Sequence, residues 1–163
     1  MSLDQLMANF HQKGRITWIG IRETRKAPLT EVKEVTADQA TGLIGDHYAG
    51  KTNKTRQVTL IQAEHLKAVA SFMGRDQVDP GLVRRNIVVQ GINLLSLKDK
   101  QFSIGDAILE CTGLCHPCSR MEQNLGVGGY NAMRGHGGIT ARVIKGGLIK
   151  LEDIIRVVDQ KIQ

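Results

Sequence analysis

Short apolar runs that alternate with polar residues recur along most of this chain, and they constrain its fold more than any other feature. The runs lie at residues 15–24, 32–37, 56–62, 86–91, 102–113, 138–147 and 151–158, and a Gly105-Asp106 turn divides the fifth into two pieces. Alternation with a period of two predicts strands that bury one face. The strands follow one another without a regular exchange of strand and helix, so a doubly wound parallel sheet is not expected. About seven strands predict a mostly β protein of mixed β/α content, a partly closed antiparallel β-barrel with short peripheral helices.

The segments with helical spacing are short. Residues 3–10 and 63–74 have apolar residues at helical spacing; Gly14 follows the first segment, and Gly74 ends the second. Asp79-Pro80 pairs an N-cap residue with a proline suited to the first helical position, which predicts a turn through Arg85. A further helix is expected to begin just after Cys118.

No repeat, linker or low-complexity segment divides the 163 residues, so we expect a single domain over residues 1–163. The first residues, MSLDQLMANFHQKG, lack the apolar centre of a signal peptide. No run reaches the roughly 18 apolar residues of a membrane span. The three cysteines have no disulfide-scaffold spacing. These features predict a cytoplasmic protein without a membrane partner.

The formal net charge of +6 predicts an anionic ligand. The basic residues are spread along the chain and form no long run. Only 4% of the residues are aromatic, which leaves few surfaces on which bases could stack. A phosphorylated or pterin-like small molecule is therefore expected as the ligand, and nucleic acid is unlikely.

Two of the cysteines lie in the stretch TGLCHPCSRMEQNLGVGGY, residues 112–130. The S-x-x-E pattern from Ser119 to Glu122 predicts a capping box, with Cys118 one residue outside a helix N-terminus. Pro117, the helix end and Arg120 would together favour a thiolate at Cys118, which makes it the candidate nucleophile or metal ligand. A Cys115–Cys118 redox pair or a zinc site stays open as an alternative, although no βαβ pattern or second ligand pair accompanies it. Cys111 is interpreted as a buried apolar residue.

A dense run of glycines follows the cysteines. Gly128 and Gly129 could let backbone N–H groups approach an anion, and Arg134 and His136 lie in the same segment. These four residues are candidate cofactor contacts, and a turn-rich loop is the alternative. The segment matches neither the dinucleotide-binding nor the P-loop pattern.

Two further groups are candidates for the site. Asp46 and His47, in the predicted loop at residues 42–51, form a candidate acid/base or anion-binding edge. Arg84, Arg85 and Asn86 precede a predicted strand, where they could face a cofactor together with Arg120. A solvated basic face is the alternative for the two neighbouring arginines.

The chain resembles a stand-alone MOSC domain, the module named for the C-terminal part of molybdenum cofactor sulfurases. The resemblance spans about residues 42–158 and rests on the order of six segments: GLIGDHYAGK, RQVTLIQ, GLVRRNIVV, IGDAILECTG, PCSRME and GGITARVIKGG. It implies a barrel-like fold and a functional thiol at Cys118. It also implies the molybdenum cofactor, a molybdopterin, as the bound group, with Cys118 as the metal ligand.

What the resemblance implies about activity takes two forms. In related amidoxime-reducing enzymes, the cysteine ligates molybdenum and N-hydroxylated substrates such as base analogues are reduced. In cofactor sulfurases, the domain is thought to receive sulfur, which would make this chain a sulfur carrier with a persulfide on Cys118. The partner domains of the larger enzymes are missing, and no flavin, haem or iron–sulfur motif is present, so an external electron donor is required. A non-enzymatic anion- or nucleic-acid-binding module is the remaining alternative, and a homodimer could complete the site.

Overall fold

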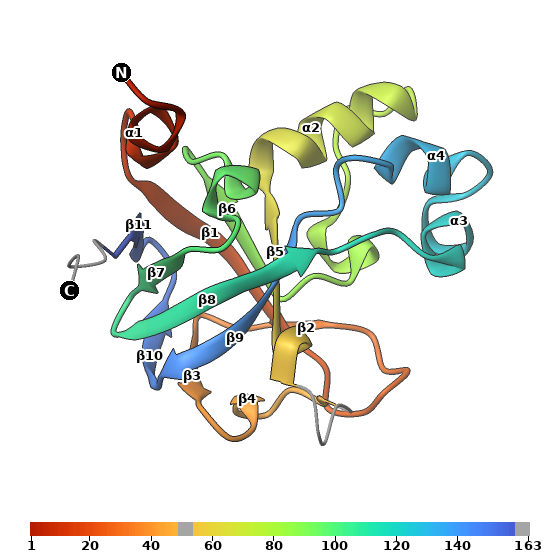
Figure 1. The fold of residues 1–163 in the computed structure, drawn as a ribbon. Coiled ribbons are helices and arrows are strands. Elements are labelled where there is room, and N and C mark those ends of the chain that lie inside the picture. The colour runs from red at the N-terminus through yellow and green to blue at the C-terminus, as the bar shows by residue number, and fades with distance from the viewer. Residues whose placement is uncertain (49–53, 159–163) are drawn as a thin grey trace.

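Seven strands close into a barrel in the computed structural model, which describes residues 1–48 and 54–158 (Figure 1). The strands follow the order β11-β7-β8-β9-β5-β6-β1, and β11 pairs back onto β1 to close the ring. A short strand, β2, extends the sheet beyond β1. The bounds are β1 Gly14–Ile21, β2 Thr30–Glu31, β5 Val58–Gln62, β6 Ile87–Gln90, β7 Gln101–Ile104, β8 Ala107–Leu114, β9 Ile139–Lys145 and β11 Ile154–Val157.

The predicted mostly β barrel with short helices is therefore confirmed. Its ring contains one parallel pair, β5 with β6, whereas the other neighbours in the barrel are antiparallel. The parallel pair requires a crossover connection, and the chain makes it through the helical segment between residues 62 and 87.

A second, three-stranded sheet covers part of the barrel. It consists of β3 Glu34–Asp38, β4 Gly42–Leu43 and β10 Gly147–Lys150, in the order β10-β3-β4. Its side chains Val35, Leu43 and Ile149 join the apolar core of the barrel.

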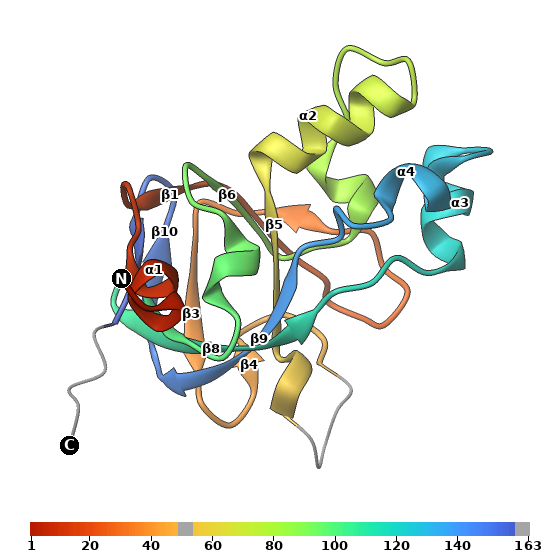
Figure 2. The same ribbon diagram turned by 45° about the horizontal axis from the view of Figure 1, so that its top comes forward.

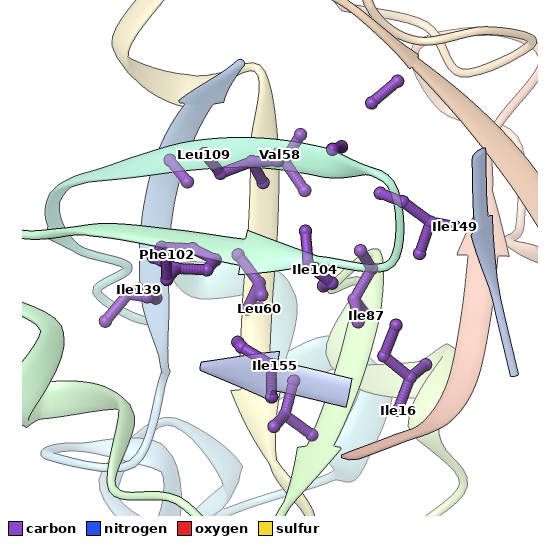
Figure 3. Close-up of a cluster of buried hydrophobic side chains, with 14 of the residues drawn as sticks. Ile16, Val58, Leu60, Ile87, Phe102, Ile104, Leu109, Ile139, Ile149 and Ile155 are labelled. Atoms are coloured by element: carbon purple, nitrogen blue, oxygen red, sulfur yellow. The ribbon is translucent and has the colours of Figure 1, made fainter. Parts of the chain in front are cut away.

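The barrel is filled by apolar, mostly aliphatic side chains, which converge from its strands and from the second sheet (Figure 3). Leu60, Ile87 and Val89 belong to this interior cluster, whereas their neighbours Ile61 and Val88 belong to a second cluster. This alternation follows from the two-residue period of a strand, which turns successive side chains to opposite faces. The outer faces of β5 and β6 are therefore apolar and need a cover.

Helices provide that cover. The α-helices are α1 Leu3–Ala8, α2 Ala63–Phe72, α3 Ser119–Leu125 and α4 Gly129–Met133, and the 3₁₀ helices are η1 Lys54–Arg56, η2 Pro80–Val83 and η3 Leu94–Leu97. Leu66, Val69, Met121 and Met133 of α2, α3 and α4 pack in the second cluster. Figures 1 and 2 show these three helices grouped beside one end of the barrel, with β8 running toward α3.

Three local predictions need correction. The glycine segment after Leu125 contains the helix α4, because Gly128 and Gly129 begin a new turn. The chain closes with three strands, β9, β10 and β11, where two were expected. The loop predicted at residues 42–51 begins with β4, and its residues 49–51 lie outside the described part of the chain.

The proline turn is confirmed, with the Asp79 side chain accepting a hydrogen bond from the Gly81 N–H at 2.9 Å. The described helices include none that is both long and apolar enough to cross a membrane. The single-domain organisation stays a prediction.

Candidate functional site

Cys118 lies at the junction between the barrel and the helices. β8 ends at Leu114, the Cys115 N–H then bonds to the Gly138 carbonyl at 2.9 Å, and Cys118 is itself the N-cap residue of α3. Its backbone is extended, with φ −127° and ψ 179°, and its side chain makes no capping hydrogen bond. Cys118 is exposed, whereas Cys115 and Cys111 are buried. The exposed thiol is therefore the one that sequence analysis selected.

The predicted capping box is wrong. Ser119 is the first helical residue, so it cannot be the N-cap, and Glu122 does not reach back to the helix start. The Glu122 carboxylate instead accepts the N–H groups of Tyr130 at 2.9 Å and Gly128 at 2.7 Å. These two hydrogen bonds lower the pKa of Glu122. The glycine segment thus does hold an anion, but the anion is the chain's own carboxylate.

Cys118 opens onto a pocket of about 300 Å³. Cys115, His116 and Met121 line it from the same segment, and Thr59 lines it from β5. The remaining lining residues are six arginines: Arg22, Arg25, Arg56, Arg84, Arg85 and Arg120. No acidic side chain lines this pocket among the described residues.

The register of the sheet explains why distant arginines meet. Ile19 of β1 pairs with Ile87 of β6 in antiparallel orientation, so the end of β1 and the start of β6 share one edge. Arg22 follows β1 and Arg84 precedes β6, so both lie at that edge.

Arg85 forms the buried floor of the pocket, with 6% of its surface exposed. Its guanidinium donates to the carbonyls of Gly137 at 2.8 Å, Val83 at 2.8 Å and Cys115 at 3.2 Å. No carboxylate is paired with it among the described residues. Its charge is satisfied by neutral carbonyls and contributes to the positive potential of the pocket.

Arg84 is half-buried and has a left-handed backbone, with φ 58°. Its guanidinium donates to the Ala27 carbonyl at 3.1 Å and thereby fastens the segment that carries Arg25. Burial lowers the pKa of Arg84, and the charges of Arg22 and Arg120 lower it further, whereas Cys118 acts in the opposite direction. These charges therefore interact within one site.

A second pocket, of about 520 Å³, adjoins the first and shares Arg22, Arg25, Arg56 and Thr59 with it. It is also lined by Asp46, His47, Tyr48, Thr55, Gln57 and Asn86. The structure thus brings the predicted residues Asp46, His47 and Asn86 to the same cleft as Cys118, although they line its other part.

Asp46 is a buried carboxylate in this second pocket. It accepts the Arg22 N–H at 2.7 Å, and its Oδ1 atom lies 3.8 Å from the Arg22 Nε. Burial raises the pKa of Asp46, and this effect outweighs the hydrogen bond and charge of Arg22. The Arg22 Nε is buried and has no hydrogen-bond partner among the described residues. An anion entering the cleft would find a donor that is already desolvated.

The buried Asn86 side chain forms hydrogen bonds to two strands. Its Oδ1 accepts both the backbone N–H and the hydroxyl of Thr59 at 3.1 Å, and its Nδ2 donates to the Gly20 carbonyl at 3.1 Å. Asn86 therefore joins β1 and β5 beneath the cleft.

Gly128, Gly129, Arg134 and His136 line neither pocket. Gly129 lies where α4 packs on α3, because an added Cβ would approach both the Leu125 Cβ and the Met121 carbonyl oxygen to 2.6 Å. Arg134 is exposed at the end of α4. The His136 ring packs edge-on against His65, with 4.8 Å between the ring centroids. Their role as cofactor contacts stays a prediction.

Arg22, Arg25 and Arg56 were missed as site residues, although their positions carried a signal. Arg22 lies near the end of the run at residues 15–24, Arg56 begins the run at residues 56–62, and Arg84 and Arg85 precede the run at residues 86–91. Arginines at several strand ends can meet at one barrel edge when the strand order brings those ends together, and the strand order was not known from the sequence. Among the described residues, no three His, Cys, Asp or Glu side chains are grouped as metal ligands.

Comparison with known proteins places this geometry in context. The model of one protein family, described as the MOSC domain, matches residues 33–156. The crystal structure of the YuaD protein from Bacillus subtilis superposes with a TM-score of 0.79 at 22% identity, covering 92% of this chain and 98% of that one. YiiM from Geobacillus stearothermophilus gives a TM-score of 0.73 at 16% identity, covering 91% and 77%. YiiM from Escherichia coli gives 0.68 at 18% identity, covering 90% and 70%. Comparison with curated protein sequences gives no significant match.

Proposed function

Because the chain belongs to the MOSC domain family, we propose that it binds the molybdenum cofactor in the arginine-lined cleft, with Cys118 as the ligand of molybdenum. One observation carries this proposal: a single exposed thiol opens onto a pocket that six arginines line. A thiolate is a soft ligand, and the arginines suit the phosphate of a pterin cofactor.

The residues present fit such a group. The buried Arg22 Nε lacks a hydrogen-bond partner among the described residues, so a bound phosphate oxygen could satisfy it without further desolvation. The buried Arg85 supplies a fixed positive charge beneath the pocket. A sulfur ligand, a desolvated donor and an excess of positive charge are what an anionic metal cofactor requires.

The reaction we propose is the two-electron reduction of N-hydroxylated small molecules, such as base analogues. The cofactor, when bound, supplies the redox chemistry, and an external partner supplies the electrons. The chain's own residues bind the cofactor, position the substrate beside it and handle protons. Asp46 and His47 line the adjoining part of the cleft, and the raised pKa of Asp46 suits a carboxyl group that delivers a proton. A cytoplasmic location and a homodimer belong to the same proposal.

The experiment is a metal analysis of protein made in a host that synthesises the cofactor. Wild type and Cys118→Ser are compared for molybdenum content and pterin fluorescence, with Cys111→Ser as a control because Cys111 is buried in the barrel core. We expect molybdenum in wild type and in the control, and its loss in Cys118→Ser. Metal-free wild type, or equal loading of all three proteins, would overturn the assignment.

A second measurement tests the reaction. The loaded protein is supplied with a chemical reductant and an N-hydroxylated base, and formation of the amine is followed. We expect turnover by wild type and none by Cys118→Ser. A loaded wild type that forms no amine from any N-hydroxylated substrate would refute the reductase activity while leaving cofactor binding intact.

The exposure of Cys118 also favours a sulfur carrier, because a partner protein can reach this thiol directly. In that function, Cys118 accepts sulfane sulfur from a desulfurase and holds it as a persulfide. Intact mass after incubation with a cysteine desulfurase measures it. A gain of one sulfur atom that cyanide removes is expected, and the absence of any gain excludes this function.

A further inference from the structure

Cys115 is a second thiol in the pocket, and the functions proposed above do not use it. It lines the same pocket as Cys118, three residues earlier in the chain, but only 3% of its surface is exposed. Cys118 is exposed. A diffusing oxidant therefore meets Cys118 first, while Cys115 lies protected behind it.

Hydrogen bonds to Gly138, Arg85 and Arg56 hold Cys115 in place. Its N–H donates to the Gly138 carbonyl at 2.9 Å, and its carbonyl accepts from Arg85 at 3.2 Å. Its Sγ atom lies 3.9 Å from the Arg56 Nη2, which acts as a weak donor to the sulfur. Because Arg56 also lines the pocket, this contact keeps the Cys115 sulfur at the pocket wall.

No helix or strand separates the two cysteines. Residues 115–118 belong to neither a helix nor a strand, so no regular hydrogen-bond ladder fixes their backbone. A disulfide needs Cα atoms roughly 4.4–6.8 Å apart. Because the ring of Pro117 fixes its φ, the rotation that brings the two sulfurs together has to come from the two cysteine side chains and from the backbone of His116 and Cys118. Cys111 has no such access, since it lies in β8 within the barrel core.

From this arrangement we infer that Cys118 is a site of peroxide modification and that Cys115 is its resolving thiol. The Cys118 thiolate attacks a peroxide oxygen, the S–O bond forms and the O–O bond breaks, and the departing hydroxide takes up a proton to become water. The Cys118 sulfur is oxidised by two electrons and the peroxide is reduced. Cys115 then attacks this sulfur, the S–S bond forms, and the S–O bond breaks with release of a second water.

The consequence is a reversible closure of the site. The disulfide prevents further oxidation of Cys118 to the sulfinic acid, which a thiol cannot reverse. While the disulfide persists, Cys118 is unable to ligate a metal or accept sulfur. A dithiol reductant restores both thiols. This inference concerns the two sulfurs alone and does not depend on bound molybdenum.

The test uses the reduced full-length chain without added metal, treated with hydrogen peroxide and then analysed by peptide mass mapping. Wild type should form an intramolecular Cys115–Cys118 disulfide that dithiothreitol removes. Cys115→Ser should lose this disulfide and accumulate sulfinic acid on Cys118. Cys111→Ser is the matched control and should behave as wild type.

Two outcomes would overturn the inference. One is sulfinic acid on Cys118 of wild type at the same rate as in Cys115→Ser, and the other is a disulfide that links other partners. If Cys115→Ser does not fold, the mass map of wild type alone still decides between disulfide and sulfinic acid. Molybdenum content is measured separately, so this test can fail while the proposed function stands.

Discussion

The arginine-lined pocket and the glycine segment at residues 126–138 both carry residue types of an anion site, yet they use them in opposite ways. In the pocket, six arginines meet without an acidic lining residue among those described. In the glycine segment, the N–H groups of Gly128 and Tyr130 already bind the Glu122 carboxylate. The difference shows that a run of glycines beside charged residues can serve internal packing, and it favours the arginine-lined pocket as the place to test for an anionic ligand.

The largest expected effect is on the stability of the fold, and it comes from a substitution in the glycine segment. Gly138 has φ 84°, and an added Cβ would lie 1.9 Å from the Leu60 carbonyl oxygen. We expect Gly138→Ala to lower the free energy of unfolding by about 3 to 5 kcal/mol, because backbone strain and a backbone collision add together. Urea unfolding measures this.

The matched control is Gly135→Ala. Gly135 has φ 80°, but nothing lies within 4 Å of the place that an added Cβ would take, so only the left-handed conformation is penalised. We expect a loss of about 1 to 2 kcal/mol for this variant. Equal losses for the two glycines would contradict the view that the segment is built for close packing.

Substitutions at the two neighbouring arginines of the pocket, Arg84 and Arg85, should also differ in their effect on stability. Replacing the buried Arg85 by Met leaves the carbonyls of Val83, Gly137 and Cys115 without their donor. We expect a loss of about 2 to 4 kcal/mol in the free energy of unfolding. Arg84→Gly loses two hydrogen bonds to the carbonyls of Ala27 and Arg25, but it also relieves the strain of a side chain on a left-handed backbone. Because these two effects oppose each other, the change in the free energy of unfolding should stay within about 1 kcal/mol.

Ligand binding should show whether Arg84 faces an anion in the pocket. Titration calorimetry with inorganic pyrophosphate is expected to show weaker binding by Arg84→Gly than by wild type, although the variant folds normally. Unchanged binding would mean that Arg84 only fastens the neighbouring loop to η2.

A smaller effect, and one that depends on pH, is expected at Glu122. Its pKa is lowered in the folded protein, so the ionised carboxylate stabilises the fold above the pKa of the unfolded chain. That contribution is lost as pH falls through the lowered folded pKa. Glu122→Gln should therefore be less stable than wild type near neutrality, and the gap should shrink in acid. A gap that is independent of pH would show that the two N–H bonds do not depend on charge.

The features that the sequence predicts are those set by residues close together in the chain, whereas features that depend on distant residues were missed. Period-two alternation is a local signal, and it predicts the barrel strands because each strand must bury one face. The capping box failed because the Glu122 carboxylate binds Gly128 and Tyr130, residues that come after it in the chain, rather than the helix start. Arg22 and Arg56 were missed because they join Arg84 only through the strand order of the barrel. Cys118, which the sequence singles out as the functional thiol, is the exposed cysteine and is the cap residue itself, and its function stays a prediction.

The smallest expected effect is at Asp46, the buried acid of the adjoining second pocket. Burial raises the pKa of Asp46, so the folded protein binds a proton more readily than the unfolded chain does. Stability contributed by this group is present at low pH and is lost as pH rises from the ordinary aspartate pKa through the raised value. Asp46→Asn keeps an oxygen that can accept the Arg22 N–H and removes the buried charge. We expect the variant to match or exceed wild type at neutral pH, by less than about 1 kcal/mol, and to lose that advantage in acid. Urea unfolding at both pH values measures this, and a variant that is clearly weaker at neutral pH would show that the Asp46 charge stabilises the arginines of the cleft.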